Sequence, residues 1–356
     1  MTHYFDHAAT SPIRPEVIAL MAEVMGQVGN ASSVHKSGRQ ARSILERARE
    51  QVGMLVGARA QEVIFTSGGT EANNQVLQAH AGGPILVSAI EHDSIINGRP
   101  GLEQVAVDQN GLIDLKALEA RLGQGEPGLL SLMLVNNETG VIQPVAEAAA
   151  LAKSKGWMVH TDAVQAAGKI PLAMGTLGVD YLSLSGHKFG GPQGVGALVL
   201  RPGMDPKPLL QGGGQERRRR AGTENVAGIA GMGLAADMAL DRPIANQAFQ
   251  NSIEEALKSL KPGITIVAEH AARVSTITCA IWPGNTAERM LMKFDLKGVA
   301  LSSGSACSSG KVGASHVLKA MGYSDEEALS ALRFSTGWNT TEDDVAALIE
   351  VLKALA

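Results

Sequence analysis

A lysine, Lys188, stands at the end of an apolar run that reads as a buried strand, in the segment SLSGHKFGGPQGVG. Burying an ammonium group is costly, so a lysine in this position is unusual. Burial also lowers the pKa of an amine, and a neutral amine can bond a carbonyl carbon as a Schiff base. A lysine on a surface loop is the alternative. Gly190, Gly191 and Pro192 follow at once and indicate a backbone fixed close to a ligand, which favours a functional amine.

The segment TSGGTEAN joins a short apolar strand, EVIFT, to a helix that begins near Thr70. Glycines permit a tight turn, and the N–H groups and dipole at the start of a helix favour a phosphate. The hydroxyl of Thr70 can add a further hydrogen bond. An ordinary strand-to-helix loop with a threonine N-cap is the alternative, and this segment alone does not decide between the two.

A carboxylate, Asp162, ends another apolar strand in the segment HTDAVQAAGK. Ligands of open α/β sheets bind outside the carboxyl ends of the strands. At that place Asp162 can be a helix N-cap, a metal ligand or the partner of a cationic ring nitrogen. No further candidate metal ligands are clustered near Asp162 in the sequence, so we expect no metal site.

Taken together, the strand-end lysine, the strand-end aspartate and the phosphate-binding turn are what pyridoxal 5'-phosphate requires. The lysine bonds the cofactor, the acid keeps the pyridine nitrogen protonated, and helix N–H groups hold the phosphate. The sequence therefore predicts a pyridoxal-phosphate enzyme.

The two cysteines stand in different surroundings. Cys307 lies among serines and glycines in SSGSACSSGK, which is typical of an exposed loop with a reactive thiol. Cys279 lies in the apolar run STITCAIW and is expected to be an inert core residue. Two cysteines make no disulfide framework.

Short apolar runs alternate with helical segments through the first two thirds of the chain, which predicts an α/β fold with a mainly parallel sheet. The alternation changes near residue 240, after a long helix from about Glu224 to Leu240. We expect a large cofactor-binding domain over residues 13–242. Residues 1–12 and 243–356 are expected to form a smaller α+β domain that carries the Cys307 loop.

Composition excludes several classes of partner. The 356 residues carry a formal net charge of -4 with 3% aromatic side chains, which argues against nucleic-acid binding. The N-terminus has no basic region followed by an apolar run, and no stretch approaches the roughly 18 apolar residues of a membrane span. The expectation is a cytoplasmic protein.

The chain as a whole resembles the cysteine desulfurases. These are a group of fold-type-I pyridoxal-phosphate enzymes (class V aminotransferases) that supply sulfur for iron–sulfur clusters. The resemblance runs almost end to end, and the SSGSAC loop is similar to the subgroup with a longer cysteine loop. It rests on YFDHAATSP, FTSGGTEANN, VNNETGVIQP, HTDAVQAAGKIP, SLSGHKFGGPQGVGAL, GGGQERRRRAGTENV, SSGSACSSG and LRFSTG. The run of arginines after GGGQE and the KVGAS that follows SSGSACSSG depart from the usual pattern.

The resemblance implies roles around the cofactor ring. Lys188 would be the Schiff-base lysine, Asp162 would pair with the pyridinium nitrogen, and Gln165 would hydrogen-bond the ring oxygen. His92 would stack on the ring and assist proton transfer. Cys307 would be the nucleophile that receives sulfur.

The phosphate and the substrate would have their own ligands. The resemblance implies that Asn137 and Arg333 bind the substrate carboxylate. It assigns the phosphate to Gly69, Thr70, Ser185 and His187, with Thr223 reaching the phosphate of the other subunit of a homodimer.

The implied reaction converts L-cysteine to L-alanine and leaves a persulfide on Cys307. The sulfur would pass to an acceptor protein such as an iron–sulfur assembly scaffold. Three alternatives remain open: a selenocysteine lyase, a class V aminotransferase that makes no use of Cys307, and an inactive relative that acts only as a binding partner.

Overall fold

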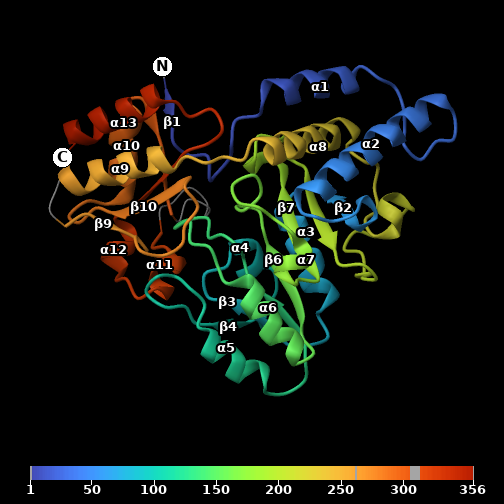
Figure 1. The fold of residues 1–356 in the computed structure, drawn as a ribbon, viewed down its shortest axis with the longest axis horizontal. Helices are drawn as coiled ribbons and strands as arrows, with labels where there is room; N and C mark the ends of the chain where they lie inside the picture. Colours follow the sequence, from blue (N-terminus) through green and yellow to red (C-terminus); the bar gives the residue numbers. More distant parts are fainter. Residues whose placement is uncertain (1, 261–262, 305–312, 356) are drawn as a thin grey trace.

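A seven-stranded sheet forms the centre of the computed structural model, which describes residues 2–260, 263–304 and 313–355 (Figure 1). Its strands, in spatial order, are β2 (Val63–Thr66), β8 (Gly196–Leu200), β7 (Tyr181–Ser185), β6 (Met158–Asp162), β5 (Leu129–Ser131), β3 (Ile85–Ser88) and β4 (Glu103–Val105). Neighbours from β7 to β4 run parallel, which confirms the predicted mainly parallel α/β fold.

Strand β8 is antiparallel to both of its neighbours. It follows β7 through a loop that contains only the 3-10 turn η2 (Gly186–Lys188), with no crossover helix. A strand that returns without a crossover must run antiparallel. The loop that carries Lys188 is therefore a short connection pinned at both ends by the sheet.

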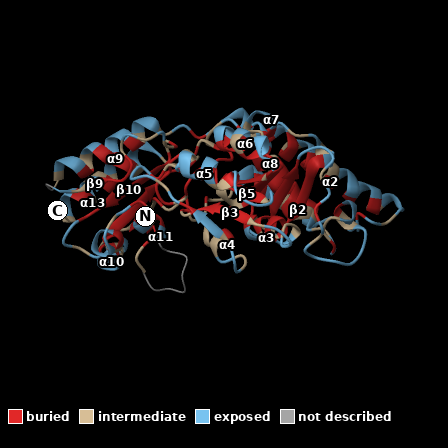
Figure 2. Cartoon of the chain, turned by 90° about the horizontal axis from the view of Figure 1, so that it is seen from below, coloured by how far each residue is buried: buried red, intermediate tan, exposed pale blue. Residues whose placement is uncertain are grey.

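Helices cover both faces of this sheet. Figure 2 shows the buried strands between α6, α7 and α8 on one side and α3 and α4 on the other. The helices and turns of this part are α1 (Pro15–Met25), α2 (Lys36–Leu55), η1 (Ala60–Glu62), α3 (Gly69–Ala79), α4 (Asp93–Ile96), α5 (Leu115–Leu122), α6 (Val145–Ser154), α7 (Met174–Leu177), η3 (Gln215–Arg218) and α8 (Val226–Asp241). Helix α8 is the long helix expected from the sequence.

The C-terminal part has its own antiparallel sheet, in the order β12 (Ser302–Ser303), β13 (Ala331–Ser335), β10 (Ile277–Ile281) and β9 (Thr265–Ile266). Its helices are α9 (Gln247–Leu260), α10 (Ala287–Leu296), α11 (His316–Ala320), α12 (Asp325–Leu329) and α13 (Glu342–Leu355). Trp282, Phe294 and Phe334 pack edge to face in a separate apolar core. The domain boundary at residue 242 stays a prediction.

The N-terminus belongs in space to this C-terminal part. Strand β1 (His3–Tyr4) pairs in parallel with β11 (Val299–Ala300), and Asp6 forms a bridge with Ser335. The chain then crosses toward the central sheet, so that residues 6–10 lie between the two sheets. Within the described residues, no helix combines the length and the apolar character needed to cross a membrane.

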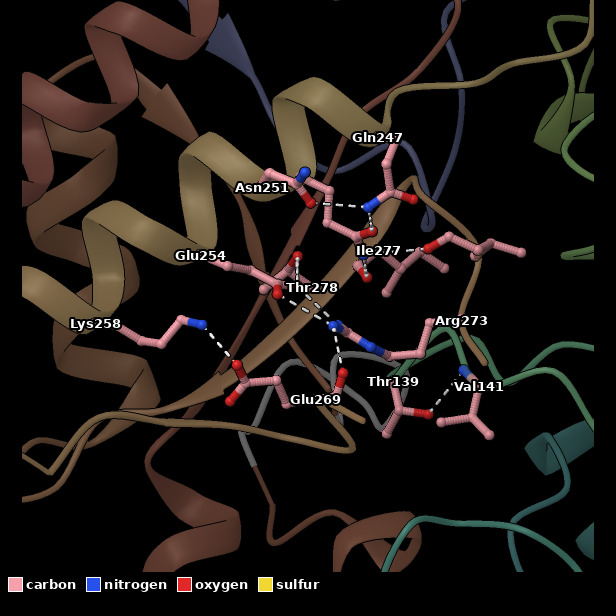
Figure 3. Close-up of polar contacts among 12 residues, drawn as sticks. Thr139, Val141, Gln247, Asn251, Glu254, Lys258, Glu269, Arg273, Ile277 and Thr278 are labelled. Atoms are coloured by element: carbon pink, nitrogen blue, oxygen red, sulfur yellow. Dashed lines mark hydrogen bonds and ion pairs between the residues drawn. The ribbon is translucent and has the colours of Figure 1, made fainter. Parts of the chain in front are cut away.

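A buried ion pair fastens α9 to the segment that enters β10 (Figure 3). Arg273 donates from Nη1 and Nη2 to the two carboxylate oxygens of Glu254, at 2.8 and 3.1 Å. Thr278 donates its hydroxyl to the same carboxylate at 2.9 Å. The backbone of Arg273 also forms a bridge with Val141, in the loop that follows β5. The pair thus joins the C-terminal part to a loop beside the central sheet.

Replacing Arg273 with Met should lower the free energy of unfolding by about 3–5 kcal/mol, because it leaves the buried Glu254 carboxylate without its cation. The double variant Arg273→Met/Glu254→Gln should recover most of that loss. Urea denaturation of the parent, the single variant and the double variant measures these changes in the free energy of unfolding.

The control is Lys258→Met, which removes the exposed ion pair between Lys258 and Glu269 drawn in the same figure. That change should cost about 0–1 kcal/mol. Equal losses for Arg273→Met and Lys258→Met would contradict the structural role of the buried pair.

Candidate active site

One cavity of about 320 Å³ lies at the carboxyl ends of β6 and β7, where the N-terminal segment and the C-terminal sheet meet the central sheet. Neighbouring parallel strands end at the same edge, so the polar residues that follow them converge. The sequence-predicted residues that line it are Gly69, Thr70, His92, Asn137, Asp162, Gln165, Ser185, His187, Lys188 and Arg333.

Lys188 lies in η2, directly after β7, and is half-buried. Its Nζ donates hydrogen bonds to the backbone carbonyls of Ala8 and Ala9, both at 2.7 Å. These acceptors belong to the N-terminal segment that the β1–β11 pairing holds in place. The amine is therefore fixed at the cavity by backbone groups far away in the sequence.

Asp162, the last residue of β6, is 6% exposed and faces the cavity. Its Oδ1 accepts a hydrogen bond from the backbone N–H of Val164 at 2.9 Å. Its Oδ2 accepts one from Nδ2 of Asn73 at 2.7 Å. Two donors hold the carboxylate in one orientation, in which it can pair with a cationic ring nitrogen.

The turn between β2 and α3 has the expected form. The N-cap of α3 is Gly68, with no side chain to cap the helix, so Thr70 stands inside the first turn and is not the N-cap. A Cβ on Gly69 would lie 2.8 Å from Cγ2 of Val164, so the backbone approaches this neighbour too closely for any side chain. The first N–H groups of α3 are left to an anion at the cavity.

Arg333 stands in the interior strand β13 with its side chain only 4% exposed. Its Nη2 pairs with Asp6 at 2.9 Å, and its Nη1 donates to the backbone carbonyl of Asn137 at 3.0 Å. Its Nε is buried and has no hydrogen-bond partner among the described residues. The guanidinium lines the cavity, where its charge favours a carboxylate.

Two predicted residues remain, and only one of them belongs to the described part of the chain. Thr223 is exposed, precedes α8 and does not line the cavity. Cys307 lies outside the described residues. Cys279, by contrast, is fully buried in β10, where burial raises the pKa of its thiol to about 12. A thiolate at Cys279 is strongly disfavoured, as expected for an inert core residue.

The sequence reasoning missed other lining residues: Asp6, Ala8, Ala9, Asn73, Ser94, Met133, Val135, Val164 and Ser302. Ala8 and Ala9 take part through carbonyl groups, which carry no side-chain signal. Asn73 had a detectable signal, because it stands four residues after Gly69 and so shares its helix face.

Positively charged side chains lie in the cavity, as Lys188 and Arg333 do, and beside it, as Lys169 does. Lys169 donates from Nζ to Oε1 of Gln165 at 2.5 Å, and burial, with the charges of Lys188 and Arg333, lowers its pKa to about 7. Burial, together with the charges of Lys188 and Lys169, lowers the pKa of His187 to about 4, so His187 is neutral at pH 7. A site built in this way favours an anionic ligand such as a phosphate or a carboxylate.

Lys169 should make stability depend on pH. Its pKa falls from 10.5 in the unfolded chain to about 7, so the unfolded chain binds the extra proton between these values. The free energy of unfolding should therefore rise with pH from about 7 to about 10, by up to about 1 kcal/mol per pH unit. Lys169→Met should flatten that rise, and the exposed Lys207→Met should not. Urea denaturation across this pH range, on protein freed of bound small molecules, checks it; parallel curves for Lys169→Met and the parent would contradict it.

Known proteins share this fold and sequence over the whole chain. The aminotransferase class-V family model matches residues 3–348. A cysteine desulfurase of Sinorhizobium fredii is 40% identical over 99% of this chain and 96% of its own length. Cysteine desulfurase IscS of Dictyoglomus turgidum is 38% identical over 99% of this chain and 94% of its own length. The X-ray structure of a NifS-like protein from Rickettsia africae superposes with a TM-score of 0.92 at 37% identity, covering 100% of this chain and 99% of that one. These matches confirm the resemblance found in the motifs: the chain belongs to the class-V aminotransferase family.

Proposed function

We propose that this protein is a pyridoxal-phosphate-dependent cysteine desulfurase that converts L-cysteine to L-alanine and leaves the sulfur on Cys307 as a persulfide. The observation that carries the proposal is the convergence of Lys188, Asp162 and the start of α3 on one cavity. Relatives named cysteine desulfurase, 38–40% identical over nearly the whole chain, favour this reaction over the aminotransferase alternative.

The residues of the cavity fit the cofactor. The start of α3, with no side-chain cap and no room for a Cβ at Gly69, suits a phosphate. Ser185 and the neutral His187 line the same cavity and would complete the phosphate site. Asp162 would hold the ring nitrogen, and Gln165 would bind the ring oxygen through its amide. Lys188 would be the amine that bonds the aldehyde carbon.

The chain would bind and orient the substrate through groups already placed around the cavity. Arg333, which lines the cavity, would take the carboxylate, and Asn137 would assist it. When bound, the cofactor supplies an electron sink for the bond changes at the substrate Cα. Lys188 and His92, which both line the cavity, would move protons there.

The sulfur transfer would be carried by Cys307. Its thiolate forms a bond to the substrate sulfur while the carbon–sulfur bond of the substrate breaks. The electron pair of that bond goes to carbon, which gains a proton and leaves as L-alanine. The enzyme keeps the sulfur as a persulfide, which an acceptor protein would then take by thiol exchange.

The proposal extends to assembly. Thr223 is exposed and lies outside the cavity of its own chain, which supports a homodimer in which it reaches the phosphate of the second subunit. One apolar core takes its buried residues only from Phe5 and residues 253–352, which supports a small domain made of residues 1–12 and 243–356 beside a large domain over residues 13–242.

Two cysteine variants test the function. Cys307→Ala should bind cofactor and L-cysteine and show the absorbance change of substrate binding, yet release almost no sulfur, since the acceptor thiol is gone. Cys279→Ala is the matched control. It should keep its activity and lose on the order of 1 kcal/mol of stability, as a small buried truncation does. Sulfide and alanine released by Cys307→Ala at the parent rate would contradict the proposed function.

A further inference from the structure

A continuous line of hydrogen bonds joins Asp162, the last residue of β6, to His92, the N-cap of α4. Asn73, on α3, donates from Nδ2 to Oδ2 of Asp162 at 2.7 Å and to Oγ of Ser94 at 2.9 Å. Oγ of Ser94 lies 2.9 Å from Nδ1 of His92. Asn73 and Ser94 are 1% and 8% exposed, so water competes little with these bonds.

The orientation of the Asn73 amide follows from its neighbours. A carboxylate accepts hydrogen bonds only, so the amide must turn its NH2 group toward Asp162. Both hydrogens of that group are then used, one on Asp162 and one on Ser94. The amide oxygen is left buried without a partner among the described residues. Leaving a buried acceptor unsatisfied is unfavourable, so the two donated bonds outweigh that cost.

The tautomer of His92 follows in the same way. His92 is the N-cap of α4, and its Nδ1 accepts the backbone N–H of Ser94 at 3.1 Å. A backbone N–H can only donate, so Nδ1 carries no hydrogen, and the neutral ring holds its hydrogen on Nε2. Because Ser94 Oγ already accepts from Asn73, its own hydrogen is available to Nδ1 as well. Every donor in the line therefore points from Asn73 outward, to Asp162 and to His92.

We propose that Asn73 is a positioning residue: it fixes the Asp162 carboxylate directly and, by directing the hydroxyl hydrogen of Ser94 to Nδ1, reinforces the Nε2–H tautomer of His92 that the backbone N–H of Ser94 sets. His92 then presents a hydrogen-bond donor to the cavity. The role of this line in catalysis rests on the proposed function, whereas the tautomer does not.

The first experiment reads the tautomer directly. The holoenzyme, labelled with 15N-histidine, is measured by 15N–1H correlation NMR, with the His92 signals assigned from their loss in His92→Gln. Hydrogen on Nε2 is expected in the parent and in both variants, whereas the 15N shift of His92 Nδ1 should change in Ser94→Ala, which removes the hydroxyl donor, and in Asn73→Ala, which frees that hydroxyl to turn away. A parent with its hydrogen on Nδ1, or unchanged His92 signals in both variants, would overturn the proposal. These results do not depend on whether the enzyme releases sulfur.

The second experiment separates hydrogen bonding from packing. Asn73→Asp keeps the size of the side chain but offers neither donor, so it should lower kcat at least as far as Asn73→Ala, by about ten-fold or more, with KM for L-cysteine nearly unchanged. The control is Asn74→Ala. Among the residues that the structure describes, the Asn74 amide donates to the backbone carbonyls of Thr70 and Ser94 alone, and this variant should behave as the parent does. An Asn73→Asp enzyme with the parent kcat would contradict the positioning role.

Discussion

The buried guanidinium of Arg333 holds together the three segments that make the cavity. It projects from the C-terminal sheet, pairs with Asp6 of the N-terminal segment and donates to the carbonyl of Asn137 in the central part. A buried charge needs such partners, since leaving it unpaired is strongly unfavourable. Once Asp6 is fixed in this way, Ala8 and Ala9 lie where their carbonyls can accept from Lys188. The position of the amine thus depends on an interaction made by residues more than a hundred positions away in the sequence.

The same convergence sets the electrostatics of the cavity. Lys188 and Arg333 contribute to the lowered pKa of Lys169, and the two lysines contribute to the lowered pKa of His187. The excess of positive charge stabilises an anion that enters the pocket, which suits a cofactor phosphate and a substrate carboxylate. Asp162 is the exception, and its carboxylate is already held by the N–H of Val164 and the amide of Asn73. Positive charge for the anions and one oriented carboxylate for the ring nitrogen lie within a single cavity.

Much of this was predictable from the sequence, because strand ends and glycine turns are local signals. The apolar runs before Asp162 and Lys188 predicted their places at the edge of a parallel sheet, and the break after Thr66 predicted the turn into α3. Contacts made by backbone carbonyls, such as that of Ala8, have no side-chain signal. The antiparallel direction of β8 depended on a connection too short for a crossover, which the pattern of apolar runs did not show. The pairing of β1 with β11 is a contact between the two ends of the chain, and no local pattern predicts it.

The central claim is that the amine delivered by β7, and no other, holds the cofactor. Lys169 is the instructive competitor, because its amine is bonded to Gln165 of the cavity and its pKa of about 7 leaves much of it uncharged near neutral pH. Borohydride reduction of the purified enzyme, followed by peptide mapping by mass spectrometry, distinguishes the two. We expect the cofactor to be fixed to the peptide containing Lys188 and to be absent from Lys169. Cofactor on Lys169, or on neither lysine, would contradict this claim.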